Sequence, residues 1–200
     1  FKGIFGASAP MFRLHGSVPQ SMRQAVFSQF SETNSGILFC TDVAARGLDL
    51  PRVDWILQYD PPCETTDYIH RAGRTARSGH GGSAVIFLLP SEAPYVSLLA
   101  SHGLATTPLS LDSLFDQTTT YIPGAGKFKN KGEMAAVILQ RRFETVLSRN
   151  STLVACAKQA FRSFVRAYAT HSGETKGIFQ IHSLHLGHAA KTFALGESPK

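Results

Sequence analysis

The chain has 200 residues, of which 43% are hydrophobic, so it can build a substantial core. No apolar run approaches the roughly 18 residues that a membrane-spanning helix needs, and we therefore expect no membrane partner. The three cysteines, Cys40, Cys63 and Cys156, form no closely spaced pair, which indicates reduced thiols in a cytosolic or nuclear compartment and argues against a disulfide framework.

The net charge of +6 is unevenly distributed along the chain. Residues 1–135 contain 11 Lys or Arg and 11 Asp or Glu, whereas residues 136–200 contain 9 and 3, so the second segment accounts for the whole excess. A basic surplus confined to one segment favours a polyanionic partner, and RNA is the partner we expect. The alternative is a solvated helix face that is basic without binding anything.

The first half of the chain alternates between amphipathic and continuous apolar segments. The pattern predicts helices over residues 17–31, 64–71 and 91–101, and short buried strands over residues 36–40, 53–59 and 84–89. Continuous apolar strands that alternate with helices are typical of βαβ units and of a parallel sheet covered on both faces.

The second half reads as a linker followed by helices. Residues 109–131 mix turn formers with polar residues and show little periodicity, so we expect the end of a strand and a linker there. Helical patterns follow over residues 133–149, 151–170 and 187–195. The predicted domains are therefore an α/β domain over 1–108, a linker over 109–132 and a basic helical domain over 133–200.

Two polar runs stand where a parallel sheet usually binds ligands, beyond the carboxyl ends of its strands. One run extends from Thr41 to Asp49, and the other, from His70 to Arg77, follows the next strand and its helix. In the second run Arg71, Arg74 and Arg77 recur every third residue, so that Arg74 and Arg77 point to nearly the same side. Two guanidinium groups aimed together suit the charge of a phosphoryl group in transfer. The alternative is an exposed basic helix end.

These runs resemble motifs V and VI of the DEAD-box RNA helicases. The matching stretches are Thr41-Asp42-Val43-Ala44-Ala45-Arg46-Gly47-Leu48-Asp49 and Tyr68-Ile69-His70-Arg71-Ala72-Gly73-Arg74-Thr75-Ala76-Arg77, and Leu14-His15-Gly16 with Gln20-Ser21-Met22-Arg23 resembles a further family motif. The resemblance covers residues 12–102 as a second RecA-like domain. It implies an α/β fold, with a RecA-like parallel sheet and flanking helices that lacks its first strand, followed by a small all-α domain.

The resemblance implies a role for each matching residue. Arg74 and Arg77 reach the ATP phosphates as arginine fingers, and Arg77 is the finger we favour. Asp49 contacts the ribose side of the nucleotide. Arg46 binds ATP and helps to join two RecA-like domains across the ATP-binding cleft, and His70 couples the nucleotide site to the partner domain. The RNA backbone lies along Gly16, Gln20, Arg23, Thr41 and Asp42, and such contacts would be independent of sequence.

The chain departs from the family pattern at two places. Ser17 stands where the family usually has Asp after His-Gly, which leaves one polar contact near the RNA unassigned. The first strand of the domain, with the family's motif IV, has no counterpart in residues 1–12.

The end of the chain resembles the helical extension of a DEAD-box subgroup. Residues 160–168, 178–179 and 184–195 are similar to the extra domain of helicases that act in the nucleolus on precursors of the large ribosomal subunit. This resemblance implies pre-ribosomal RNA and pre-ribosomal proteins as partners, and a nuclear, nucleolar location.

The nucleotide requires a second domain, because the chain contains neither an Asp-Glu-Ala-Asp run nor a phosphate loop. Gly124-Ala125-Gly126-Lys127 lacks the framing that a phosphate loop needs, and we expect a linker there. We therefore expect ATP with Mg²⁺, the metal being held by a first RecA-like domain, and no ATP hydrolysis by this chain alone. No metal is expected at His182, His185 and His188. The alternatives are a non-catalytic RNA-binding or assembly module and a DNA-directed superfamily-2 helicase.

Overall fold

The computed structural model describes residues 9–42, 51–75, 81–118, 122 and 130–199. The chain divides into two compact units, Phe1–Leu88 and Leu89–Lys200. Among the described helices, none is both long and apolar enough to cross a membrane.

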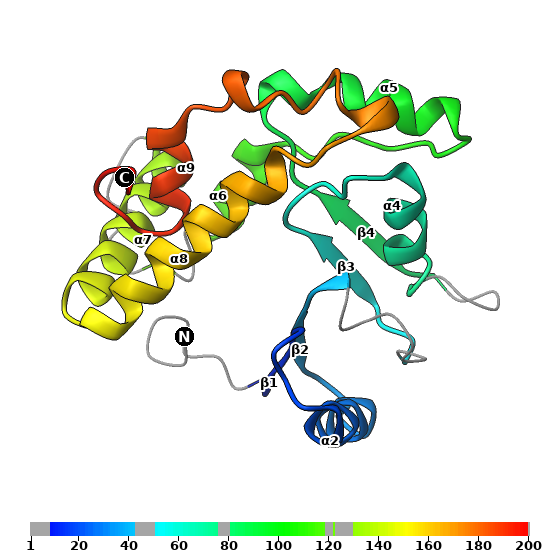
Figure 1. Ribbon diagram of the computed structural model, residues 1–200, viewed down its shortest axis with the longest axis horizontal. Coiled ribbons are helices and arrows are strands. Elements are labelled where there is room, and N and C mark those ends of the chain that lie inside the picture. The colour runs from blue at the N-terminus through cyan, green and yellow to red at the C-terminus, as the bar shows by residue number, and fades with distance from the viewer. Residues whose placement is uncertain (1–8, 43–50, 76–80, 119–121, 123–129, 200) are drawn as a thin grey trace. The chain divides into compact units, whose positions relative to one another are not determined.

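The first unit contains short parallel strands with flanking helices (Figure 1). Its described elements are β1 (Met11–Leu14), α2 (Gln20–Ser31), β2 (Ile37–Cys40), β3 (Trp55–Gln58), α4 (Thr65–Ala72) and β4 (Ser83–Ile86). β1 pairs with β2 and β3 pairs with β4, both in parallel. The three predicted strands and the helices over 17–31 and 64–71 are confirmed, whereas β1 was not predicted.

Each strand pair packs one face against a helix. The ring of Phe12 on β1 meets the ring of Phe30 on α2 edge-on at 5.6 Å, and Leu14 is 1% exposed. On α4, Tyr68 is buried, and burial raises the pKa of its phenol above the usual range. This packing fixes α2 and α4, which carry several of the predicted site residues.

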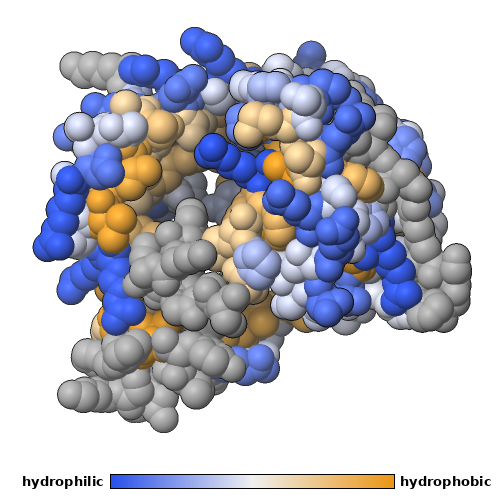
Figure 2. Space-filling view, turned by 90° about the horizontal axis from the view of Figure 1, so that it is seen from below, coloured by the Kyte–Doolittle hydropathy of each residue, from blue (hydrophilic) through white to orange (hydrophobic). Residues whose placement is uncertain are grey.

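The opposite face of the β3–β4 pair is apolar and exposed. Trp55 is 61% exposed and Leu57 is 65% exposed. Both share this face with Val85 on β4. Beyond the strand ends the rings of Tyr59 and Phe87 lie 6.1 Å apart, and both are exposed. Within the described residues, the sheet therefore differs from the predicted one, which is covered on both faces. Apolar side chains also reach the surface in the space-filling view (Figure 2).

The second unit is helical. Its described elements are η1 (Pro90–Glu92), α5 (Pro94–Ser101), α6 (Leu111–Thr118), α7 (Lys131–Ser148), α8 (Ser151–Tyr168), η3 (Gly173–Thr175), η4 (Ile181–Ser183) and α9 (Leu186–Thr192). Helices α5, α7, α8 and α9 confirm the predictions for 91–101, 133–149, 151–170 and 187–195. Helix α6 lies in the stretch predicted to be a strand end and linker, and that prediction is wrong for residues 111–118.

The core of the second unit gathers around Phe179. Its ring stacks on His171 at 4.2 Å and meets Tyr95 and Tyr168 at 5.2 and 6.1 Å. Because Tyr95 belongs to α5 and Tyr168 to α8, these two helices share one core. By packing, α5 belongs with the helices that follow it. The predicted linker and domain limits at 108 and 132 themselves stay a prediction.

Candidate functional site

Asp42 and Arg71 form the charged centre of the candidate site. Asp42 lies two residues beyond the end of β2, and Arg71 lies in the last turn of α4. The Arg71 guanidinium donates from Nε to Oδ1 of Asp42 at 2.7 Å and from Nη2 to Oδ2 at 2.5 Å. Side-chain exposures of 25% for Arg71 and 37% for Asp42 leave the pair partly screened by water. Two parallel bonds of this kind set the orientation of the two side chains and add to their electrostatic attraction.

Arg71 also reaches the chain that follows β3. Its Nη1 donates to the carbonyl oxygen of Asp60 at 2.9 Å and to Oε1 of Gln58 at 3.4 Å. The guanidinium therefore joins the ends of two strands to helix α4. Asp42 belongs to the first predicted polar run and Arg71 to the second, so this contact brings the two runs together.

Thr41 precedes Asp42 at the end of β2. Its backbone N–H donates to the carbonyl oxygen of Leu14 at 3.2 Å, which extends the pairing of β1 with β2. The side chain of Thr41 is exposed and stands beside the charged pair in sequence. A hydroxyl in this position can donate to a phosphate or to a ribose oxygen.

The turn after α4 positions Arg74. The N–H of Arg74 donates to the carbonyl of Arg71 at 3.1 Å, and its own carbonyl accepts from Val53 at 3.3 Å. Thr75 is buried, and its hydroxyl donates to the carbonyl of Asp54 at 3.2 Å. These bonds fix the backbone on both sides of Arg74, whose side chain is half-buried.

This turn lies at a different end of β3 from the one expected. Val53 and Asp54 precede β3, whereas the whole second run was expected beyond the carboxyl ends of the strands. The physical reason is the length of α4: eight residues of helix advance about 12 Å, close to the length of a four-residue strand. The Arg71 side chain reaches the carboxyl ends, while the backbone of Arg74 lies next to the residues before β3.

His70 was expected to couple the nucleotide site to the partner domain. Its side chain is exposed on α4.

A loop organised by Arg23 contains the other predicted RNA contacts. Arg23 on α2 donates from Nη2 to the carbonyl of Gly16 at 2.7 Å and from Nε to that of Val18 at 2.8 Å. Its Nη1 approaches Oε1 of Gln20 at 3.4 Å. The structure thus brings Gly16, Gln20 and Arg23 together, and a side chain at Gly16 would meet only open space. Ser17, the departure from the family pattern, is exposed in this loop.

Three predicted site residues, Arg46, Asp49 and Arg77, lie outside the described residues. No role was predicted for Arg71, which makes the most side-chain hydrogen bonds among the described site residues. Arg71 belongs to the series of three arginines, but roles were predicted only for Arg74 and Arg77. A basic residue in the last turn of a helix that follows a strand is a candidate partner for an acid at the neighbouring strand end.

Two protein-family models match separate parts of the chain. Residues 4–79 match the helicase conserved C-terminal domain. Residues 150–200 match the C-terminal extension described as ATP-dependent rRNA helicase SPB4-like. The first match contains both polar runs and the Arg23 loop, and the second contains α8 and α9.

Similar proteins align with nearly the whole chain. The human ATP-dependent DNA helicase DDX31 is 44% identical and covers 94% of this chain, which spans 23% of that protein. The ATP-dependent RNA helicase dbp7 of Schizosaccharomyces pombe is 46% identical over 94% of this chain and 27% of its own length. DEAD-box ATP-dependent RNA helicase 17 of rice is 43% identical, with 96% of this chain and 33% of its own length covered. The chain thus spans between about a quarter and a third of these relatives.

Solved structures give the same fold. The structure of Mss116p bound to single-stranded RNA and AMP-PNP covers 98% of this chain and 34% of its own, with 25% identity and a TM-score of 0.57. The DEAD-box helicase Mss116 bound to single-stranded RNA and UDP-BeF has a TM-score of 0.52, with 26% identity over 98% of this chain and 34% of its own. Parallel strands with flanking helices therefore match a RecA-like C-terminal helicase domain followed by a helical extension.

Proposed function

We propose that this chain, which matches helicase family models over residues 4–79 and 150–200 and is similar to DEAD-box RNA helicases, supplies the phosphate-sensing half of an ATP-dependent RNA-remodelling motor. In this proposal ATP and Mg²⁺ are held by a first RecA-like domain. Binding of ATP closes the two domains over RNA and bends one strand of a short duplex. The bent strand then no longer pairs with the other strand, which is released. Hydrolysis then permits release.

Arg74 and Arg77 are the proposed arginine fingers. Their positive charge stabilises the negative charge that spreads over the γ-phosphoryl group during its transfer to water, and such contacts typically change the rate by about 10³–10⁵. The backbone bonds on both sides of Arg74 support this role, since a charged group contributes most when its position is set beforehand. Asp49 would contact the ribose, and Arg46 and His70 would couple the site to the first domain.

The observation that supports the proposal most is the bond between Asp42 and Arg71. It links the chain that would touch RNA, at Thr41 and Asp42, to the helix that leads into Arg74 and Arg77. A change at the phosphates can therefore reach the RNA side through one bidentate contact. The loop of Gly16, Gln20 and Arg23 would provide further contacts to the RNA backbone.

We place the motor in ribosome assembly. The match of residues 150–200 to an extension described as rRNA helicase SPB4-like supports pre-ribosomal RNA as the substrate, with pre-ribosomal proteins as neighbours. The corresponding location is the nucleus, and within it the nucleolus.

Two other functions have specific support. The human relative carries the name of a DNA helicase, which favours the DNA-directed alternative. A non-catalytic RNA-binding module is consistent with a sequence that contains neither a phosphate loop nor an Asp-Glu-Ala-Asp run. RNA and DNA oligonucleotides of one sequence, compared as activators of ATP hydrolysis, distinguish the first of these, because a DNA-directed motor responds to DNA.

The test joins this chain to a first RecA-like domain from a similar helicase and measures ATP hydrolysis with and without RNA. We expect RNA-stimulated hydrolysis that falls by about 10³-fold or more in Arg77→Ala, because the finger is lost. Arg52→Ala, an exposed arginine of the same unit, is the matched control and should retain activity. A joined protein that is folded and binds RNA but hydrolyses no ATP would instead indicate the binding module.

A further inference from the structure

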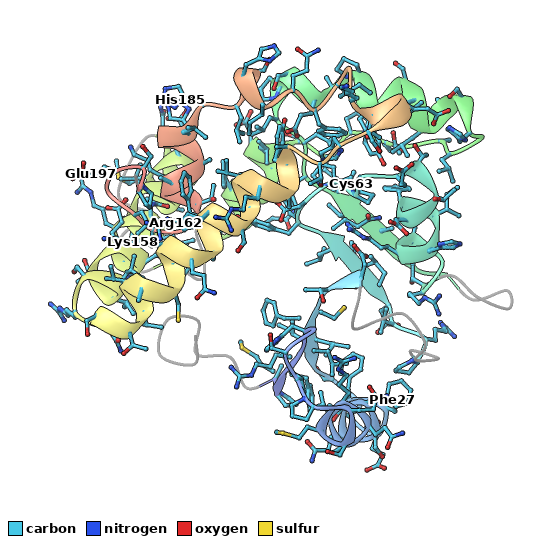
Figure 3. All side chains as sticks on the ribbon, in the orientation of Figure 1. Phe27, Cys63, Lys158, Arg162, His185 and Glu197 are labelled. Atoms are coloured by element: carbon cyan, nitrogen blue, oxygen red, sulfur yellow. The ribbon has the colours of Figure 1, made fainter. Side chains whose placement is uncertain are left out.

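Helix α8 has an unusual charge pattern. Its 18 residues include Lys158, Arg162 and Arg166 and contain no Asp or Glu. All three basic side chains are exposed. They recur every fourth residue, so they follow one side of the helix, and we call them the α8 basic ridge. Figure 3 labels two of its members, Lys158 and Arg162, on this helix.

The ridge has a defined length. Four residues of α-helix advance about 6 Å and turn about 40° beyond a full turn, so the three charges extend over about 12 Å along a gently winding line. One strand of double-stranded DNA presents a phosphate about every 3.4 Å of helix axis, and on that scale a ridge of this length lies beside roughly three or four phosphates of a nucleic-acid backbone.

The other side of α8 holds the ridge in place. Phe161 and Tyr168 are buried in the core of the second unit, and Phe164 lies 5.7 Å from the ring of Phe193. The first turn is capped by Asn150, whose side chain accepts from the N–H of Leu153 at 3.1 Å. A capped and packed helix holds the backbone of the three basic residues in a fixed arrangement, so less backbone entropy is lost on binding.

Two of the three acidic residues of this segment have partners outside the ridge. Residues 136–200 contain Glu144, Glu174 and Glu197. Glu144 accepts from Nε2 of Gln140 at 2.8 Å, and Glu174 lies 3.0 Å from the ring of His102. Glu197 follows α9 in the C-terminal segment. The segment therefore presents an excess of positive charge, and the ridge contains a third of its 9 Lys and Arg residues.

We infer that the α8 basic ridge binds the phosphate backbone of RNA. Guanidinium groups match phosphate oxygens in shape and charge. The exposed residues beside the ridge are small or polar, namely Ala155, Gln159, Ser163 and Ala167, and they offer none of the aromatic anchors that dominate protein interfaces. This surface suits electrostatic binding of a polyanion better than docking of a protein.

The inference deepens the proposed function, on which it rests for the choice of RNA as the ligand. It adds a second RNA contact in the helical unit, separate from the one expected at Gly16, Thr41 and their neighbours. Because the ridge touches only phosphates, its binding should be independent of base sequence and of ATP.

The test measures binding of a fluorescein-labelled RNA hairpin to the whole 200-residue chain, without nucleotide, over a series of salt concentrations. The ridge variant combines Lys158→Gln, Arg162→Gln and Arg166→Gln. The matched control combines Arg141→Gln, Arg149→Gln and Lys176→Gln, three exposed residues of the same unit, and removes the same charge. Circular dichroism and thermal unfolding establish that both variants are folded, and Lys158→Gln with Arg166→Gln serves if the triple variant is not.

We expect the ridge variant to flatten the slope of log K against log salt by about 2 to 3, since each lost phosphate contact removes about 0.7 to 0.9. The control should change the slope by less than about 1. Equal losses in the two variants would show that general charge attracts RNA, and an unchanged slope in the ridge variant would indicate a different partner, such as an acidic protein. Either result would overturn the inference. Absence of ATP hydrolysis in the joined protein would leave it standing, because this assay uses no ATP.

Discussion

Asp42 was expected to lie along the RNA backbone, and the structure gives its carboxylate a partner. Both oxygens accept from Arg71, so the negative charge that would repel a phosphate is offset by a guanidinium. An RNA contact at Asp42 stays a prediction. The geometry supports Thr41 as the group beside it that would donate to RNA, and Asp42 as the acceptor that holds Arg71 in place.

Replacing Arg71 by Lys should weaken this link while keeping the charge. An ammonium group cannot form the two parallel bonds, and the contacts to Asp60 and Gln58 are lost as well. Because the pair is partly exposed, we expect the free energy of unfolding in urea to fall by about 1–2 kcal/mol. Arg13→Lys, an exposed position on β1, should change it little.

A double-mutant cycle checks that the loss comes from the pair. If Asp42 and Arg71 act together, Asp42→Asn in the Arg71→Lys background should cost much less than Asp42→Asn alone. Fully additive losses would contradict the role assigned to this contact.

At the scale of elements, the confirmed predictions rest on patterns that are visible within a short stretch of sequence. The strands over 36–40, 53–59 and 84–89 are apolar runs bounded by turn residues, and the helices of the second unit follow an apolar period. Strand β1 was not predicted because its four residues include Arg13 and follow Pro10, which obscures the apolar pattern. Its stability comes from pairing with β2. The bond between Asp42 and Arg71 joins residues 29 apart, which no local pattern contains.

Helix α6 was also not predicted, because its stability depends on contacts with another helix. It is eight residues long, and an isolated helix of that length is marginal in water. It forms because Phe115 packs against Gly132 in the first turn of α7, where a side-chain carbon would collide with Phe115. The glycine is therefore needed for close approach of the two helices.

Gly132→Ala should consequently destabilise the second unit. Alanine favours a helix interior over glycine by up to about 1 kcal/mol, but the collision involves both the side chain and the backbone of Phe115, and overpacking of this kind costs about 1–3 kcal/mol. We expect a lower midpoint of thermal unfolding. Gly177→Ala has open space around it and should leave the midpoint nearly unchanged. A higher midpoint for Gly132→Ala would mean that α6 moves away at little cost.

At the scale of the whole molecule, a buried hydrogen bond joins residues 76 apart. The Tyr168 hydroxyl donates to Oε1 of Glu92 at 2.7 Å, and Oε2 of Glu92 accepts from the N–H of Leu89 at 2.8 Å. Glu92 is 3% exposed. Burial raises the pKa of the Tyr168 phenol above its usual range, and the bond to Glu92 raises it further.

This pKa shift predicts a loss of stability at alkaline pH. Because the folded-state pKa lies above the unfolded value of about 10, the stabilisation is complete below about pH 10 and is lost as pH rises through the folded-state pKa. Tyr168→Phe should remove this dependence and lower the free energy of unfolding by about 1–3 kcal/mol at neutral pH, since Glu92 then loses its hydroxyl donor. Unfolding in urea at several pH values measures both effects, with exposed Tyr59→Phe as the control. An alkaline loss that persists in Tyr168→Phe would point to other groups.

The shared core of α5 and the extension also determines where the chain can be recombined with its relatives. Tyr95 and Leu99 of α5 are fully buried, and the ring of Tyr95 lies 5.2 Å from Phe179 of the extension. A chimaera that exchanged only residues 150–200 would combine the extension of one protein with the α5 of another. The two halves of this core would then no longer fit each other. The segment that can be exchanged with its core intact is therefore larger than the extension and includes α5.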